Sequence, residues 1–341
     1  MMEQLPPFAT GVTLNLKELL YYKSHTVHWQ PPNKSLWSQL NGSHNSNHKG
    51  RGMNFAEVRQ YQAGDDIRSI DWRVTARTGK AHTKLFTEER EQPVILYLDL
   101  SASMRFGSQL LFKSVQCAHF ASLLSWLTVE QKDRIGAVID MGDRLVEIKP
   151  TARQQGALNI SHQLMQLNNE AMLQVQALQQ GKARKEDVVS SKDELPFQTV
   201  LQTMHRICPK GSDIIFVSDF NRIRLEDKPL LNQLRQHNRL QFVHIFDPLE
   251  MGNTAFRGSE YVTNGQQTRW LNFGQKNTRN QLKNRYIEHL NLLEKIAKNL
   301  AIPMRSISCA EPLLNQLNSI QKAGSPLSSN STHSSLGSIN E

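Results

Sequence analysis

The 341-residue sequence has no apolar run near the roughly 20 residues that cross a bilayer. Its first residues, MMEQLPPFAT, also lack the basic region and apolar stretch of a secretory signal. The three cysteines lie far apart and form no C-x-x-C pair. These absences argue against a membrane-spanning or disulfide-stabilised secreted protein, so we expect a cytoplasmic location with reduced thiols.

Common catalytic and metal-binding motifs are also missing. The sequence contains neither a G-x-S-x-G nucleophile elbow nor a P-loop G-x-x-x-x-G-K-[ST]. His44 and His48 are four residues apart, but polar loop-forming residues surround them, which does not favour a metal pair. We therefore expect the chain not to be an enzyme.

The charge is positive, with 40 Lys+Arg against 31 Asp+Glu and a formal net charge of +9. The longest basic stretch runs over 269–298, where Leu282, Tyr286 and Leu293 recur at helical spacing. This pattern predicts an amphipathic helix with a solvated basic face. Nucleic-acid binding through that face is an alternative, but no nucleic-acid motif accompanies it, and we expect no nucleic-acid partner.

Beyond Pro93, short apolar segments alternate with amphipathic ones. This order is typical of a parallel sheet covered on both faces, so we predict a doubly wound, mainly parallel α/β fold. Glycines around Asn264-Gly265 indicate a further hairpin within 251–274. The predicted strands are 94–99, 134–140, 144–149, 213–219, 240–246 and 303–308, and the predicted helices are 108–130, 152–168, 196–207, 227–238 and 278–300.

The segment before the sheet has dense charge of both signs. Apolar and polar residues alternate over 70–77, which predicts a strand, and 82–87 can return as a second one. Trp72 falls in phase with Ile70 and Val74, which favours a core position; a partner-docking anchor is the alternative. The predicted domains are an N-terminal helix and loop segment (1–49), a small charged β subdomain (50–92), an α/β domain (93–322) and a disordered Ser-rich tail (323–341).

Asp99, Ser101 and Ser103 follow the first core strand in the pattern D-x-S-x-S. In an extended chain, residues two apart point the same way, so these three oxygen-bearing side chains converge. Asp219 ends a strand that should neighbour the first one, at the edge where ligands bind in open α/β sheets. Carboxylate and hydroxyl oxygens suit Mg²⁺, although the same residues also suit a capped turn.

A threonine at the start of the helix before that second strand could supply another hydroxyl. Thr199 is the first candidate, and Thr203 lies one helical turn further on. The predicted metal ligands are therefore Asp99, Ser101, Ser103, Thr199 and Asp219.

This arrangement resembles the metal-ion-dependent adhesion site of von Willebrand factor A domains. Residues 50–104, which include AGDDIRSIDWR, closely resemble the signature of the MoxR-associated family numbered fifty-eight among domains of unknown function, which joins it to a von Willebrand factor A-like domain. The resemblance implies Mg²⁺ or Mn²⁺ held by the serines and, partly through water, by the aspartates. The sequence departs from the adhesion pattern in three places: Ala102 stands where glycine is common, Gln198 precedes the threonine, and Ser218-Asp219-Phe220 replaces Thr-Asp-Gly.

The resemblance further implies a non-enzymatic, cation-dependent interaction module. Its expected role is that of an adaptor or co-chaperone that joins a MoxR-type AAA+ ATPase to client proteins during their maturation. A Mg²⁺-dependent hydrolase or phosphotransferase built on Asp99 and Asp219 is the first alternative, and the basic nucleic-acid-binding protein is the second.

Overall fold

The computed structural model describes residues 5–26, 54–87, 93–179, 194–254, 256–263 and 268–324. His44, His48 and nearly all of the expected Ser-rich tail lie outside these residues. Within them, no helix combines the length and apolarity needed to span a bilayer. The helices are α1 (Leu16–His25), α3 (Trp72–Thr78), α4 (Lys113–Glu130), α5 (Gln154–Gln179), α6 (Phe197–Ile207), α7 (Lys228–Arg235), α8 (Lys276–Asn299) and α9 (Leu313–Gly324).

Six strands form the central sheet in the order β10-β7-β6-β3-β4-β5. Neighbouring strands are parallel except β5, which runs antiparallel to β4. The mainly parallel α/β sheet predicted from the sequence is confirmed, as is the pairing of β3 with β6. The strands are β1 (Asn54–Gln60), β2 (His82–Thr87), β3 (Pro93–Asp99), β4 (Arg134–Asp140), β5 (Leu145–Thr151), β6 (Asp213–Ser218), β7 (Arg239–Phe246), β8 (Ser259–Thr263), β9 (Thr268–Asn272) and β10 (Met304–Ser308).

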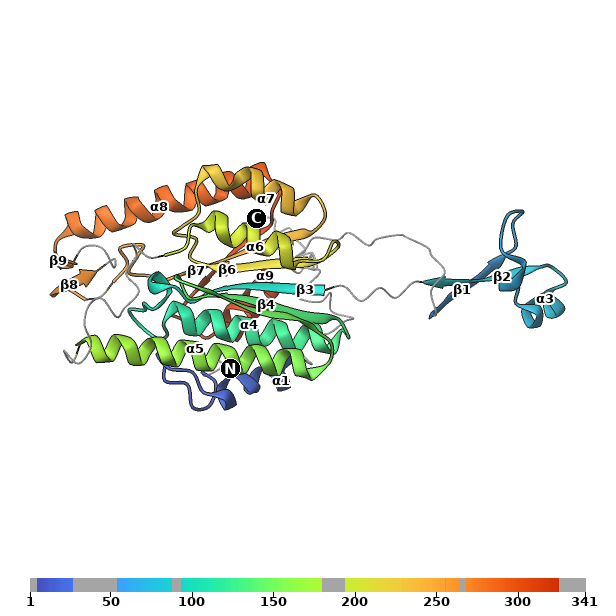
Figure 1. Ribbon diagram of the computed structural model, residues 1–341, viewed down its shortest axis with the longest axis horizontal. Helices are drawn as coiled ribbons and strands as arrows, with labels where there is room; N and C mark the ends of the chain where they lie inside the picture. The colour runs from blue at the N-terminus through green and yellow to red at the C-terminus, as the bar shows by residue number, and fades with distance from the viewer. Residues whose placement is uncertain are drawn as a thin grey trace, which may run out of the picture.

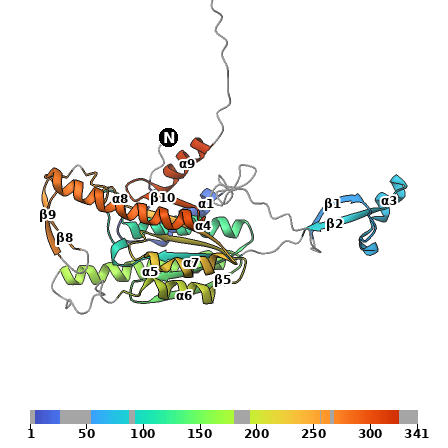
Figure 2. The ribbon, with the colours of Figure 1, turned by 90° about the horizontal axis from the view of Figure 1, so that it is seen from above.

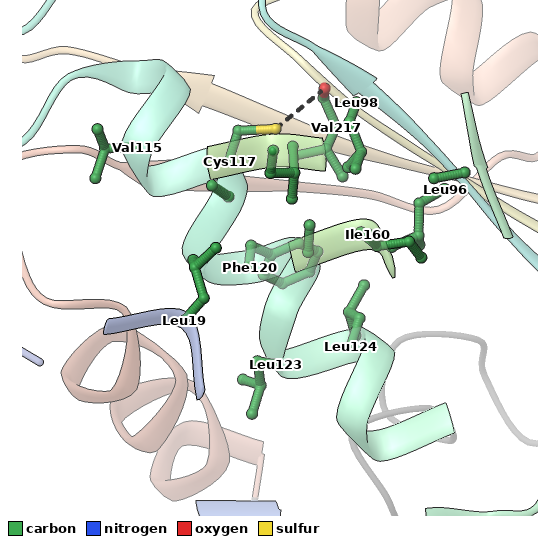
Figure 3. Packing of buried hydrophobic residues seen from close by; sticks show 14 of the residues in the cluster. Leu19, Leu96, Leu98, Val115, Cys117, Phe120, Leu123, Leu124, Ile160 and Val217 are labelled. Carbon is green, nitrogen blue, oxygen red and sulfur yellow. Dashed lines mark hydrogen bonds between the residues drawn. The ribbon is translucent and has the colours of Figure 1, made fainter. Parts of the chain in front are cut away.

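One face of the sheet packs against α4, which is buried along nearly its whole length. Figure 3 shows Phe120 and Leu124 of α4 among Leu96 of β3 and Ile160 of α5. The Cys117 thiol donates to a main-chain carbonyl of β6. Helix α1 packs on α4 and α5, so the N-terminal helix belongs to this layer (Figure 1).

The opposite face is covered by α6, α7 and α8 (Figures 1 and 2). Its core is aromatic: Phe216 packs edge-on against Phe242 at 5.7 Å between ring centroids, and Tyr97 lies 5.4 Å from Phe216. Only the last turns of the basic helix α8 are buried, through Leu293 and Ile296. We call the sheet with its two helical layers, including α1, the α/β body.

Residues 54–87 form a separate unit, which both figures draw apart from the α/β body. We call it the hairpin unit. Strand β1 pairs with β2, and α3 lies between them in the chain. The strand predicted over 70–77 is wrong, because Asp71 accepts hydrogen bonds from two main-chain amides of the first turn and Gly79, at φ +70°, ends the helix. These caps outweigh the alternating pattern.

The core position predicted for Trp72 is also wrong. Its side chain is 68% exposed on α3, and Ile67 nearby is 64% exposed. Main-chain pairing of β1 with β2 joins the hairpin unit, and surface ion pairs accompany it: Arg59 pairs with Asp65 at 2.6 Å, and Lys84 lies 3.6 Å from Asp71. No residue of α3 is buried.

Candidate functional site

The candidate site lies at the carboxyl edge of the sheet, where β3 and β6 end side by side. From β3 the chain continues to β4 on one side, and it later returns to β6 on the other. A reversal of strand order of this kind opens a crevice between the loops that follow the two strands, which is where open α/β sheets bind ligands. Three adjacent strands each bring an aspartate here: Asp99 is the last residue of β3, Asp140 is the last residue of β4, and Asp219 directly follows β6.

Asp99 is buried, with both carboxylate oxygens bonded within the protein. Its Oδ1 accepts from the Ser101 amide at 2.9 Å, and its Oδ2 accepts from the Ser218 hydroxyl at 2.5 Å. The Arg222 guanidinium lies 3.6 Å away. Burial raises the pKa of Asp99; Arg222 opposes this rise, and Asp219 and Asp140 add to it.

Ser101 and Ser103 bring their hydroxyls together on the loop after β3. Their Oγ atoms are 3.4 Å apart, and Ser101 is buried whereas Ser103 is partly exposed. The Ser101 side chain opposes the rise in the pKa of Asp99, and the Ser103 side chain contributes to the low pKa of Asp219. The D-x-S-x-S loop thus places two hydroxyls near two buried carboxylates.

Asp219 forms a buried ion pair with Lys113, the first residue of α4. The Lys113 Nζ donates to Asp219 Oδ2 at 2.8 Å and to Glu250 Oε1 at 2.6 Å. Asn221 donates to both Asp219 oxygens, through its main chain and its side chain. Burial alone would raise the pKa of Asp219, but the Lys113 charge and hydrogen bond bring it to about 2.

Arg222 is the second internal cation of the site. It donates to Asp140 Oδ2 at 2.5 Å and to the Tyr97 hydroxyl at 3.1 Å. Burial would lower the pKa of Arg222, but Asp99, Tyr97 and Asp140 together raise it. Asp140 is fully buried and also accepts from the Tyr97 hydroxyl at 2.7 Å.

Glu194 adds a carboxylate at the rim. Burial raises its pKa; Arg222 opposes the rise, and the charges of Asp99, Asp140 and Asp219 reinforce it. A Cβ built on Gly142 would lie 3.4 Å from Glu194 Cγ and 3.5 Å from Ser101 Cβ, so both side chains border the same small space.

Neither threonine candidate is tied to this network by the contacts of the described residues. Thr199, on the first turn of α6, donates its main-chain amide to Pro196, and its side chain is partly exposed. Thr203, one turn later, is also partly exposed. The structure therefore brings together Asp99, Ser101, Ser103 and Asp219 of the predicted set, and the choice between the two threonines stays open.

The donors fit a small divalent cation in chemical type. Two hydroxyls and two carboxylates converge, and the 3.4 Å between the hydroxyl oxygens is near the ~3 Å that separates adjacent ligands of an octahedral Mg²⁺. The described residues contain no cluster of three or more His, Cys, Asp or Glu side chains arranged for a metal. The two serine hydroxyls are therefore the oxygen ligands available to a cation, whereas the aspartates already have partners within the protein.

Sequence reasoning missed Lys113, Asp140, Glu194 and Arg222. Asp140 carried a signal, because it ends the predicted strand over 134–140 just as Asp99 and Asp219 end theirs. The other three come from a helix start and from loops, where no periodic pattern marks a residue that faces inward.

The comparisons with known proteins support the resemblance to family fifty-eight of the domains of unknown function. A family model described as "Protein of unknown function DUF58" matches residues 57–291, more than half of the chain. The chain is 34% identical over 116 residues to "Uncharacterized protein Rv1480" of Mycobacterium tuberculosis and to "Uncharacterized protein Mb1516" of Mycobacterium bovis. That alignment covers 34% of this chain but only 37% of each of these relatives.

Three solved structures are similar at low identity. They are a conserved hypothetical protein BatB from Bacteroides thetaiotaomicron (11% identity, 68% of this chain and 96% of that one, TM-score 0.37), an aerotolerance-related membrane protein from Bacteroides fragilis (10%, 61% and 99%, 0.34) and a membrane spanning protein from Vibrio fischeri (15%, 69% and 99%, 0.17). Two of these names refer to a membrane, which contradicts the cytoplasmic location expected from the sequence, and that expectation is withdrawn.

Proposed function

Because this chain belongs to the DUF58 family of proteins of unknown function, we propose that its α/β body is a non-enzymatic interaction module of the von Willebrand factor A-like type. A partner protein binds at the carboxyl edge of the sheet with the help of Mg²⁺ or Mn²⁺. The observation that carries this proposal is the convergence of Ser101 and Ser103 between the carboxylates of Asp99 and Asp219.

Different residues of the crevice supply the negative charge and the solvent-accessible hydroxyl that such binding requires. Asp99 and Asp219 are fixed by hydrogen bonds, so they supply charge without moving. Ser103 is partly exposed and lies at the border between the buried carboxylates and solvent. A bound divalent cation supplies a Lewis-acidic position that a carboxylate of a partner can complete.

The proposed partner is a MoxR-type AAA+ ATPase, with client proteins as the substrates of the joint machine. The hairpin unit supports a second contact with that partner, because it exposes an aromatic side chain, Trp72, beside the exposed Arg73 and Arg77. Tryptophan and arginine are the residues most enriched at the energetic centres of protein interfaces. An acidic surface on the ATPase is the matching chemistry.

Copurification tests this proposal. The full chain, immobilised and mixed with a purified MoxR-type ATPase from the same organism, should retain the ATPase in Mg²⁺ and lose it in EDTA. Ser103→Ala should weaken retention at least tenfold, whereas Ser306→Ala, the same substitution at an exposed position of β10, should not. Equal retention in Mg²⁺ and EDTA would rule out the cation, and no retention in either would rule out the partner.

A further inference from the structure

Lys113 stands where the local helix does not favour it. It is the first residue of α4, and a positive charge at a helix N-terminus opposes the helix dipole. Its side chain is only 1% exposed, so its ammonium has lost nearly all of its water. Burial of a charge is costly unless the charge is paired, which means that the two carboxylates bound to Lys113 determine its position.

Those two carboxylates connect Lys113 to the candidate cation site. Asp219 Oδ2 lies 2.8 Å from its Nζ, and the Ser103 side chain helps to lower the pKa of the same carboxylate. Glu250 Oε1, from the loop after β7, lies 2.6 Å from the Nζ and is 30% exposed. A cation on the serine hydroxyls and the Lys113 ammonium would therefore share one carboxylate.

The charges explain what that sharing does. Asp99, Asp140 and Asp219 are buried. Lys113 pairs with both Asp219 and Glu250, and Arg222 pairs with Asp140. A divalent cation that binds the serine hydroxyls beside Asp219 meets a fixed ammonium that already holds this carboxylate. At the effective dielectric of a protein interior, such like charges repel strongly.

We propose that Lys113 is a built-in cation that competes with a divalent ion for Asp219, so that the site holds the ion tightly only when a partner carboxylate supplies additional negative charge. This inference rests on the proposed function, whose cation it regulates. Cation and partner then bind cooperatively, because each supplies charge that the other needs.

Calorimetric titration of the full chain with Mn²⁺ alone tests the inference. Lys113→Met removes the competing charge and should bind Mn²⁺ at least tenfold more tightly than the wild type. Lys113→Arg keeps the charge and should bind as weakly as the wild type. Lys298→Met, the same substitution at an exposed lysine of α8, should also leave the affinity unchanged.

Circular dichroism checks that each variant is folded. If the methionine variant does not fold, Lys113→Gln replaces it, because its amide can still donate to Asp219 without carrying charge. Neutral variants that bind Mn²⁺ no more tightly than the wild type would overturn the inference and leave the proposed function standing. An absence of binding at millimolar Mn²⁺ in every variant would overturn both.

A double variant tests whether the tightened Mn²⁺ binding uses the serine hydroxyls. Lys113→Met combined with Ser101→Ala should lose the tightened binding, because the serine hydroxyl is a proposed ligand. If the double variant keeps it, the ion lies on the freed Asp219 and Glu250. The competition by Lys113 would then hold, but the D-x-S-x-S site of the proposed function would be wrong.

Discussion

The α/β body and the hairpin unit place their charged and aromatic side chains in opposite ways. The body buries Lys113 and Arg222 against carboxylates and buries Tyr97 and Phe216 in its core. The hairpin unit leaves Trp72 exposed and carries its ion pairs and helix caps at its surface. The body thus uses these groups for its own stability, whereas the hairpin unit leaves them available to another molecule.

The largest expected effect breaks the charge network of the body. Arg222→Met leaves Asp140 and Asp99 buried without their cation, and we expect a loss of about 3–5 kcal/mol of unfolding free energy. The matched change in the hairpin unit, Arg77→Met on exposed α3, should alter stability by less than about 0.5 kcal/mol. Urea unfolding followed by circular dichroism measures both. Equal effects of the two changes would contradict the contrast between the regions.

The second effect depends on pH and concerns His244, a buried residue of β7. Burial, and then the neighbouring His289, lower its pKa to about 3, whereas an unfolded histidine titrates near 6.5. Between these pH values His244 binds a proton in the unfolded chain but not in the folded chain. The stability that comes from keeping His244 neutral is therefore fully present above about pH 6.5 and is lost as the pH falls.

At about pH 5 the expected loss from His244 is about 2 kcal/mol relative to neutral pH. His244→Phe replaces the imidazole, which stacks on Phe246, by a ring that does not titrate, and its stability should depend less on pH in this range. His162→Phe, at an exposed position of α5, should keep the wild-type slope. Parallel slopes for His244→Phe and the wild type would show that His244 is not the titrating group.

The smallest expected effect on stability concerns Trp72, the exposed aromatic residue of the hairpin unit. Trp72→Ala should change the free energy of unfolding by less than about 0.5 kcal/mol, because Trp72 is 68% exposed. Its affinity for the ATPase should nevertheless fall at least tenfold. Trp270→Ala on β9, where the indole is 57% exposed, is the matched control and should bind normally. A Trp72 variant that unfolds early but binds normally would reverse the assignment.

The parts of the fold that the sequence predicted are those with strong periodicity. Continuous apolar segments such as 94–99 and 213–219 are typical of strands that are buried on both faces of a sheet. The doubly wound order then predicted that these two strands are neighbours and that Asp99 and Asp219 lie at the same edge. The hairpin of β8 and β9 followed from its turn residues.

The features that the sequence did not predict depend on local caps or on distant contacts. The helix α3 alternates like a strand, and only the capping bonds of Asp71 and the left-handed Gly79 decide its structure. Lys113 and Arg222 reach carboxylates that are far away in the chain, so their roles follow from the packing of α4 and of the loop after β6. Glu194 likewise comes under the charge of Asp99 only in the folded structure.

The hairpin unit and the candidate site flank the same strand in the chain. The unit precedes the amino end of β3, whereas the candidate site follows its carboxyl end, and the seven residues of β3 span about 23 Å. A partner that binds both surfaces is therefore bivalent, and binding to the hairpin unit would raise its local concentration at the candidate site.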